Sequence, residues 1–414
     1  MFKIIEIGTG YSSIPTKVGA ATEVVIEELS KSFIKKGYHV SIVDLKESHS
    51  YMNHIKFYEI KIPYFLKGTT HNLGIIHRVK RVIYSLQIAA LFNKLDLTQK
   101  YIFHFHNQYN YFFFDKLIKK SIRANIKTIY TLHSYIWSQN WNEIEKVVFK
   151  KYFLEIYSLK NVDIILALNE NAKNNLIHHL GISESKIILI PNGVNNEVYS
   201  PIKERSTISA LKIKHNILNE KTLLHVGSIC PRKNQLNIIK ELTYFIKKHD
   251  LKFLYAGGII DQKYFHDIQQ YIKTENIQKN VIYLGEVSPG KKLNQYYNLA
   301  DAFIFHSTSE AFGLVPLEAL AAGKPVFLSE NLKNRFFPKT SSNGIIYFNN
   351  KNIQQVIKKY LFNKQLLTTF SKKAIEYISS NFAWDAVADI HLDIFNNISN
   401  NKSISEEKLK WKQR

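Results

Sequence analysis

The sequence has little of what a crosslinked or fibrous protein requires. It contains one cysteine, Cys230, so no intramolecular disulfide can form and a disulfide scaffold is excluded. Proline and glycine number only 9 and 16 in 414 residues, too few for a collagen-like or low-complexity chain. The hydrophobic content of 45% favours a folded globular protein, and the length exceeds the roughly 250 to 300 residues that one core accommodates. At least two domains are therefore expected.

Long apolar runs and acidic residues are also scarce. No uncharged apolar run reaches about 18 residues, and the opening MFKIIEIG indicates a first strand rather than a signal peptide. These features predict a cytoplasmic protein. Asp and Glu number 34 against 56 Lys and Arg, which gives a formal net charge of +22. Such an excess attracts anionic partners, so peripheral attachment to the inner face of the cell membrane is a hypothesis to consider.

The basic excess of the first half lies in one segment. Residues 51–127 hold thirteen basic and three acidic side chains, with clusters at 77–81 (HRVKR) and 116–123 (KLIKKSIR). Residues 73–92 alternate basic and apolar positions as an amphipathic helix does, so one interpretation is docking on an anionic membrane. The expected contacts are Lys80, Arg81, Lys119 and Lys120. The alternative is a solvated, Lys-rich face. A nucleic-acid partner is not expected, because aromatic and basic residues are not interleaved on one platform.

Short β-branched or aromatic runs alternate with amphipathic stretches along the chain. This pattern is typical of βαβ units and parallel sheets. Strands are expected at 3–7, 40–43, 101–105, 128–132, 164–167 and 187–190, and then at 222–226, 252–256, 281–284, 302–305, 325–329 and 345–348. The proline- and glycine-containing run around residue 200 separates the two series. The sequence therefore predicts two α/β domains of similar size.

The densest group of chemically informative residues spans 306–326, HSTSEAFGLVPLEALAAGKPV. A strand ends there, and a short helix is expected with Pro316 at its first position and Gly323 at its C-cap. Free N–H groups at the start of that helix would favour a phosphate. Glu310 and Glu318 flank this place, and carboxylates accept hydrogen bonds from sugar and ribose hydroxyls. Each glutamate alone has an ordinary alternative, but together they favour a nucleotide-sugar site.

Two loops after strands are further candidates for anion binding. In HVGSICPRKN, residues 225–234, Arg232 and Lys233 would neutralise a diphosphate leaving group, or would form a solvated surface pair. Gly19 precedes a helix and would let backbone N–H groups approach a diphosphate, or is an ordinary loop glycine. The run GTGYSS at 8–13 has serine where a dinucleotide fingerprint has its third glycine, which argues against nicotinamide chemistry.

Three histidines end strands of the first domain. His104 and His106 close YIFHFH, and His133 closes TIYTLH, so all three are expected at the carboxyl edge of a parallel sheet, where ligands bind. Near neutral pH they would hydrogen-bond a substrate or take a proton, or they are structural histidines. No carboxylate or cysteine accompanies them at metal-ligand spacing, so no metal site is expected.

The run SEAFGLVPLEALAAGKPV resembles the Glu-x7-Glu motif of the group 1, or family 4, retaining glycosyltransferases. Other stretches resemble further segments of that family: HVGSICPRKNQ, IILIPNGVNNEVYSP and NFAWDAVADIHLDIF. The resemblance covers nearly the whole chain and implies the GT-B fold, in which two Rossmann-like domains with parallel sheets face each other across a cleft. It implies an acceptor-side domain at 1–200, a donor-binding domain at 201–381, a helix at 382–398 that crosses back to the first domain, and a polar tail at 399–414.

The resemblance also implies roles for single residues. The catalytic residues would be Glu310, which holds the donor sugar, His106, which lies beside the reacting sugar, and Lys233, which binds the diphosphate. The donor-binding residues would be Gly19, Ala20, Arg232, Lys233, Phe312, Gly313, Leu314, Val315 and Glu318, with Glu318 on the ribose hydroxyls. His104 and His133 would lie on the acceptor side. No metal and no cofactor is expected beyond the nucleotide-diphosphate sugar as co-substrate.

The predicted function is retaining transfer of a hexose-type sugar from a nucleotide-diphosphate sugar to a glycan or lipid-linked acceptor. The family implies a front-face reaction in which the leaving phosphate helps to deprotonate the acceptor hydroxyl. The chain departs from the family at Ser228, where arginine is usual, and at Ala20, where glycine is usual; Arg232 would replace the missing cation. The alternatives are a sugar-nucleotide epimerase or phosphorylase, and a non-catalytic polyanion-binding protein with the same fold.

Overall fold

A computed structural model of the chain describes residues 2–15, 21–46, 55–63, 66, 75–95, 98–133, 152–249, 251–337, 343–402 and 404. The chain forms two compact units. The first unit comprises Met1–Asn192 and Trp384–Arg414, and the second comprises Gly193–Ala383. The division thus falls a few residues before the expected boundary near 200. The reason is local: Val194 bridges Ala383, and its N–H donates to Phe382 O at 2.8 Å.

Within the residues that the structure describes, the sheet of the first unit has seven strands in the order β3-β2-β1-β4-β5-β6-β7, all paired in parallel. They are β1 Lys3–Ile7, β2 Val40–Leu45, β3 Lys56–Ile60, β4 Tyr101–Phe105, β5 Ile126–Leu132, β6 Ile164–Ala167 and β7 Ile187–Leu189. Only β3 was not expected from the sequence. It is the edge strand, and most of its side chains are not buried, so it lacks the apolar run that marks its neighbours. The strand order reverses between β1 and β4.

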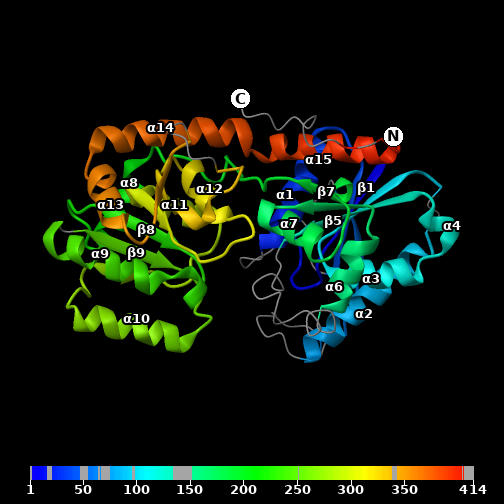
Figure 1. Ribbon diagram of the computed structural model, residues 1–414, viewed down its shortest axis with the longest axis horizontal. Helices are drawn as coiled ribbons and strands as arrows, with labels where there is room; N and C mark the ends of the chain where they lie inside the picture. The colour runs from blue at the N-terminus through cyan, green and yellow to red at the C-terminus, as the bar shows by residue number, and fades with distance from the viewer. Residues whose placement is uncertain are drawn as a thin grey trace. The chain divides into compact units, whose positions relative to one another are not determined.

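Helices cover both faces of this sheet (Figure 1). The helices of the first unit are α1 Ala21–Lys35, α2 Ile75–Phe92, α3 Gln108–Leu117, α4 Lys120–Arg123, α6 Phe153–Asn161, α7 Glu170–His178 and α15 Trp384–Ser399, with the 3-10 helix η2 Glu184–Lys186. The buried face of α1 includes Phe33, whose ring centroid lies 5.6 Å from that of Phe395 in α15. On the other face α3 packs between α2 and α6.

The sheet of the second unit has six parallel strands in the order β10-β9-β8-β11-β12-β13. They are β8 Thr222–Val226, β9 Lys252–Ala256, β10 Val281–Tyr283, β11 Ala302–Phe305, β12 Val326–Ser329 and β13 Ile345–Phe348. The helices are α8 Arg205–Lys214, α9 Gln235–His249, α10 Gln262–Thr274, α11 Lys291–Leu299, α12 Leu314–Ala321, α13 Ile353–Leu361 and α14 Lys364–Asn381, with the 3-10 helices η3 Pro231–Lys233 and η4 Glu330–Leu332. Here the order reverses between β8 and β11.

In open parallel sheets, ligands bind outside the carboxyl ends of the strands where the strand order reverses. Each unit has one such place, beyond β1 and β4 in the first and beyond β8 and β11 in the second. Among the helices that the structure describes, none is long and apolar enough to cross a membrane.

Candidate active site

In the second unit, the loop after β8 and the loop after β11 form one charged cluster. The Lys233 ammonium lies 2.5 Å from Glu310 Oε1, and Arg232 NH1 donates to the same oxygen at 2.7 Å. The backbones are joined as well, because Thr308 N–H donates to Arg232 O at 2.8 Å. Arg232, Lys233 and Glu310 were predicted from two motifs far apart in the sequence. They are neighbours beyond β8 and β11, where the strand order of this sheet reverses.

Lys233 is nearly buried, with its ammonium 4.9 Å from the centroid of the Phe305 ring. Burial lowers the pKa of Lys233; the Glu310 carboxylate opposes this shift, and the Arg232 charge adds to it. The ammonium nevertheless keeps a charged partner at hydrogen-bond distance. Arg232 is about half exposed, so this cluster presents one buried and one accessible cation.

Close backbone packing sets the course of the loop after β8. Gly257 has φ +148, and a Cβ there would lie 2.1 Å from Gly227 O. A Cβ on Gly227 would in turn lie 3.3 Å from the Lys233 side chain. Sequence reasoning missed Gly257, whose signal was a glycine pair directly after a buried strand. The two glycines let this loop lie close to β9 and over the lysine stem.

Helix α12 begins at Leu314, shortly after Glu310 of this cluster in the sequence. Gly313 is its N-cap, with φ +94, a conformation that favours glycine, and no side chain caps the helix. The expectation that Pro316 takes the first helical position is wrong, because the helix begins at Leu314 and Pro316 is its third residue. Proline is tolerated there because the first four N–H groups of a helix have no intrahelical partner. The N–H groups of Leu314 and Val315 lie in the first turn of the helix and have no intrahelical acceptor. The Phe312 side chain is buried against Phe337.

Glu318 lies on the same helix and is held by aromatic hydroxyls. Its Oε2 accepts a hydrogen bond from Tyr297 Oη at 2.8 Å. Burial raises the pKa of Glu318 to about 7, although hydrogen bonds from Tyr297 and Tyr199 oppose the shift. Sequence reasoning missed both tyrosines: Tyr297 lies outside the recognised motifs, and Tyr199 lies within IILIPNGVNNEVYSP but was given no role there. At neutral pH this carboxyl is therefore poised between its acceptor-only and its protonated form.

In the first unit, the three predicted histidines form one hydrogen-bonded group, and Glu6 of β1 joins it. His104 Nδ1 is 3.0 Å from Glu6 Oε1, and His106 Nε2 is 2.8 Å from Glu6 Oε2. His106 Nδ1 is 2.8 Å from His133 Nε2. Glu6 and His104 are fully buried, His106 is nearly so, and His133 is partly exposed. The group lies at the carboxyl ends of β1, β4 and β5, where the sequence predicted the imidazoles.

The electrostatics of this group favour an ionised Glu6 and neutral forms of His106 and His133. Burial would raise the pKa of Glu6, but the charges and hydrogen bonds of His104 and His106 lower it to about 2. Burial lowers the pKa of His106 to about 4 and that of His133 well below its ordinary value. The premise that no carboxylate accompanies these histidines is wrong, because Glu6, His104 and His106 bring oxygen and nitrogen atoms within 4.8 Å of one another.

Two predicted donor-binding residues are not described by the structure, and two predicted membrane contacts are buried. Gly19 and Ala20 lie outside the described residues. The prediction that Lys80 and Arg81 face a membrane is wrong, since they are only 4% and 7% exposed. Arg81 donates to Tyr11 Oη at 2.8 Å and lies 4.7 Å from the centroid of the Tyr109 ring, so cation–π contacts stabilise it inside the unit.

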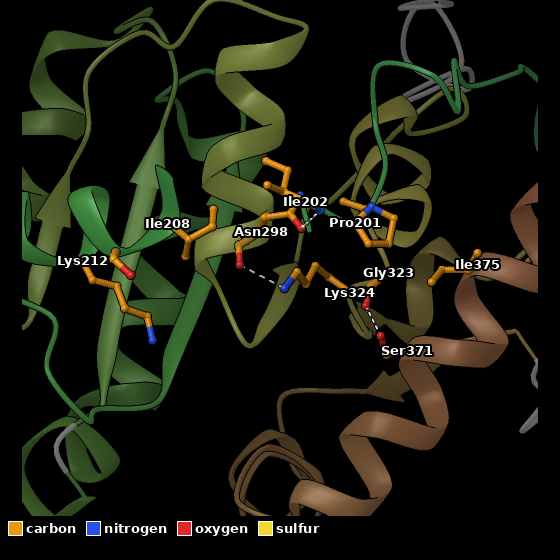
Figure 2. A pocket seen from close by; sticks show the side chains of 11 residues that line it. Pro201, Ile202, Ile208, Lys212, Asn298, Gly323, Lys324, Ser371 and Ile375 are labelled. Carbon is orange, nitrogen blue, oxygen red and sulfur yellow. Dashed lines mark hydrogen bonds between the residues drawn. The ribbon is translucent and has the colours of Figure 1, made fainter. Parts of the chain in front are cut away.

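A pocket of about 470 Å³ in the second unit lies away from these residues (Figure 2). It is lined by side chains that include Pro201, Ile208, Lys212, Asn298, Lys324 and Ile375. Lys324 Nζ reaches across to donate to Asn298 O at 3.1 Å. None of the predicted site residues lines this pocket.

Comparison with known proteins agrees with the fold and the site. The family described as "Glycosyltransferase Family 4" matches residues 22–198, and "Glycosyl transferases group 1" matches residues 208–377. The chain is 24% identical over 403 residues to the phosphatidylinositol N-acetylglucosaminyltransferase GPI3 subunit of Saccharomyces cerevisiae, covering 93% of this chain and 81% of that protein. It is 30% identical over 249 residues to alpha-monoglucosyldiacylglycerol synthase of Streptococcus pneumoniae, covering 59% and 54%.

Among solved structures, HepE of Anabaena in complex with UDP and glucose superposes with a TM-score of 0.72 at 15% identity, covering 96% of this chain and 100% of that one. Two Rossmann-like units with parallel sheets define a protein of the GT-B fold, as the sequence predicted. The two family matches together span most of both units, and the chain belongs to the group 1, or family 4, glycosyltransferases.

Proposed function

We propose that this glycosyltransferase moves a hexose-type sugar from a nucleotide-diphosphate sugar to a glycan or lipid-linked acceptor, with retention of configuration and without a metal ion. The cluster of Arg232, Lys233 and Glu310 beside the start of α12 carries the proposal. The names of the relatives support it: one acts on phosphatidylinositol, one makes a glucosyl diacylglycerol, and HepE was captured with UDP and glucose.

The residues divide the chemistry between them. Arg232 and Lys233 neutralise the diphosphate as the bond between it and the sugar breaks, and they supply the positive charge that a metal would otherwise bring. Glu310 accepts hydrogen bonds from hydroxyls of the donor sugar, and Glu318 accepts them from the ribose. The acceptor oxygen attacks the anomeric carbon on the face that the phosphate leaves, and its proton passes to that phosphate. An imidazole of the first unit hydrogen-bonds a substrate hydroxyl.

A donor panel tests the proposal. The purified chain is incubated with UDP-, GDP- and ADP-sugars, with and without EDTA, and donor hydrolysis and protection against thermal unfolding are measured. We expect one nucleotide class to be hydrolysed slowly, to stabilise the protein, and to do both equally in EDTA. Stabilisation with no turnover, even with acceptor lipids supplied, would favour the non-catalytic alternative; loss of turnover in EDTA would contradict metal independence.

The raised pKa of Glu318 predicts pH-dependent donor binding. Its carboxyl accepts from two ribose hydroxyls only when ionised, and with a pKa of about 7 the ionised fraction falls steeply below neutrality. We expect nucleotide affinity, measured by calorimetry, to be about tenfold weaker at pH 6 than at pH 8. The Glu318→Gln variant is the control, since the nucleotide phosphates titrate identically with both proteins. Equal pH dependence in the two proteins would refute this role for Glu318.

The outward face of α2 supports contact with a membrane in a form that differs from the sequence hypothesis. Ile76, Val79 and Leu86 are 62%, 44% and 40% exposed and recur at helical spacing, so they form an apolar stripe. Asn93, just after α2, donates to Leu117 O and accepts from Lys119 N–H, which places the exposed Leu117 beside the end of this stripe. The exposed cations near the stripe are Arg78, Lys94, Lys116, Lys119 and Lys120. An apolar stripe bordered by cations suits an anionic bilayer.

Liposome co-sedimentation tests this surface. Replacing Ile76 and Leu86 by Glu is expected to lower binding to anionic vesicles at least tenfold, because it removes apolar area and adds repulsion. The matched control is Ile213→Glu, which changes an isoleucine that is 80% exposed on α8 of the second unit. Replacing Lys119 and Lys120 by Glu should weaken binding chiefly at low salt. Equal recovery of all variants, or equal binding to neutral vesicles, would contradict the docking surface.

A further inference from the structure

With Glu6 ionised and His106 neutral, the hydrogen-bond chain from Glu6 through His106 to His133 fixes which ring nitrogens carry protons. An ionised carboxylate only accepts, so the nitrogens facing Glu6 must carry hydrogen: Nδ1 of His104 and Nε2 of His106. The second nitrogen of His104, Nε2, lies 2.7 Å from the Thr131 hydroxyl oxygen. Each polar atom of this buried pair has a partner of the right kind.

The same inventory extends to His133. A neutral His106 that carries its proton on Nε2 has a lone pair on Nδ1, so His133 must donate from Nε2 across the 2.8 Å contact. A neutral His133 that carries its proton on Nε2 has its own lone pair on Nδ1. His133 is the partly exposed member of the chain, whereas Glu6 is fully buried. The charge of the buried Glu6 thus determines that Nδ1 of the more accessible His133 is a hydrogen-bond acceptor.

We propose that Glu6 is a positioning residue for the glycosyl transfer: it holds His106 and, through it, His133 in the Nε2–H tautomer, so that His133 Nδ1 accepts a hydrogen bond from a substrate hydroxyl. The inference rests on the proposed function for its chemical purpose. The logic is that of a buried carboxylate that orients an imidazole in a catalytic triad, extended here by one further histidine. Glu6 itself does not touch the substrate.

Register explains why β1 supplies this residue. Glu6 lies opposite His104 in the β1–β4 pairing, next to the point where the strand order reverses. Its two oxygens each serve one imidazole, so the carboxylate also fixes the tilt between the two rings, whose centroids are 4.1 Å apart. A glutamine cannot do this, because its amide offers one acceptor oxygen and turns a donor toward the second imidazole.

The first test needs no mutation and no substrate. Protein labelled with ¹⁵N at histidine is examined by two-bond ¹⁵N–¹H correlation, which distinguishes protonated from unprotonated ring nitrogens, with assignments from His106→Asn and His133→Asn. We expect His104 to carry its proton on Nδ1, and His106 and His133 to carry theirs on Nε2. Protonation of His133 on Nδ1 would overturn the proposal, as would ring signals that report bound Zn²⁺ when that ion is added.

The second test compares Glu6→Gln with Glu23→Gln, a matched change at another nearly buried glutamate of the same unit, whose partner is Thr9 rather than a histidine. Glu6→Gln is expected to alter the His133 ring spectrum and to lower kcat at least tenfold with the donor KM within twofold; Glu23→Gln should leave that spectrum unchanged. An unaltered spectrum, or an altered spectrum with full kcat, would overturn the proposal. If no donor turns over at all, the proposed function fails while the spectra still decide the tautomers.

Discussion

Glu310→Gln is expected to fold normally and to lose roughly a hundredfold in kcat/KM, the range seen when one preorganised hydrogen bond to a transition state is removed. The amide keeps the shape of the side chain but loses the charge that faces Lys233 at 2.5 Å and Arg232 at 2.7 Å. It therefore accepts a weaker hydrogen bond from the donor sugar and leaves two cations without their shared partner. Steady-state kinetics with the donor identified by the panel measure the loss.

The matched control for this variant is Glu275→Gln, which removes a carboxylate from another glutamate–lysine pair of the second unit, 2.7 Å from Lys247. Lys247 is about half exposed and Glu275 about a third exposed, so the change should leave the kinetics unaltered and affect stability by less than about 1 kcal/mol. A Glu310→Gln enzyme with kcat/KM within threefold of the wild type would show that Glu310 does not bind the reacting sugar.

Lys233→Met is expected to reduce kcat about a thousandfold, since it removes the buried ammonium that we propose neutralises the leaving diphosphate. Methionine fills a similar volume, and Lys233 is only about 8% exposed, so packing around Phe305 should persist. Because burial lowers the pKa of Lys233, the site already disfavours its charge, and we expect the melting temperature to be unchanged or higher.

Lys233→Arg tests whether charge alone suffices. The guanidinium keeps the charge but is larger, and even a Cβ added at Gly227 would lie 3.3 Å from the lysine stem, so space is limited and the variant should recover only part of the activity. A Lys233→Met enzyme that retained kcat within fivefold, at unchanged stability, would assign charge neutralisation to Arg232 instead.

How much of this fold follows from the sequence depends on how each strand is buried. Central strands such as β1 and β11 are buried on both faces and appear as apolar runs, so their bounds were predicted correctly. The edge strand β3 is exposed on most of its length and produced no such run. Part of the site was also predictable from the sequence. Glu310 and Lys233 lie in loops directly after strands, within motifs whose residue types indicate anion or sugar binding.

Glu6 could not be found in this way. It sits inside an apolar strand, and its partner His104 lies 98 residues later, so only the register of two parallel strands brings them together. The orientation of α2 was also beyond the sequence. Periodicity shows that a helix has two faces but not which one turns inward. Arg81 is accommodated inside the unit by cation–π contacts with two tyrosine rings and by a hydrogen bond to a tyrosine hydroxyl.

The discontinuity of the first unit bears on the order in which the protein is made. Its sheet is complete once residue 189 has been synthesised, yet α15, which packs on α1, is encoded after the whole second unit. On the ribosome the apolar side chains that meet α15, Phe33 among them, therefore stay uncovered while nearly two hundred further residues emerge. The second unit is continuous in sequence and can reach its native fold first. During this interval the face of α1 that will meet α15 is an uncovered apolar surface, the kind of surface on which nascent chains aggregate or chaperones bind.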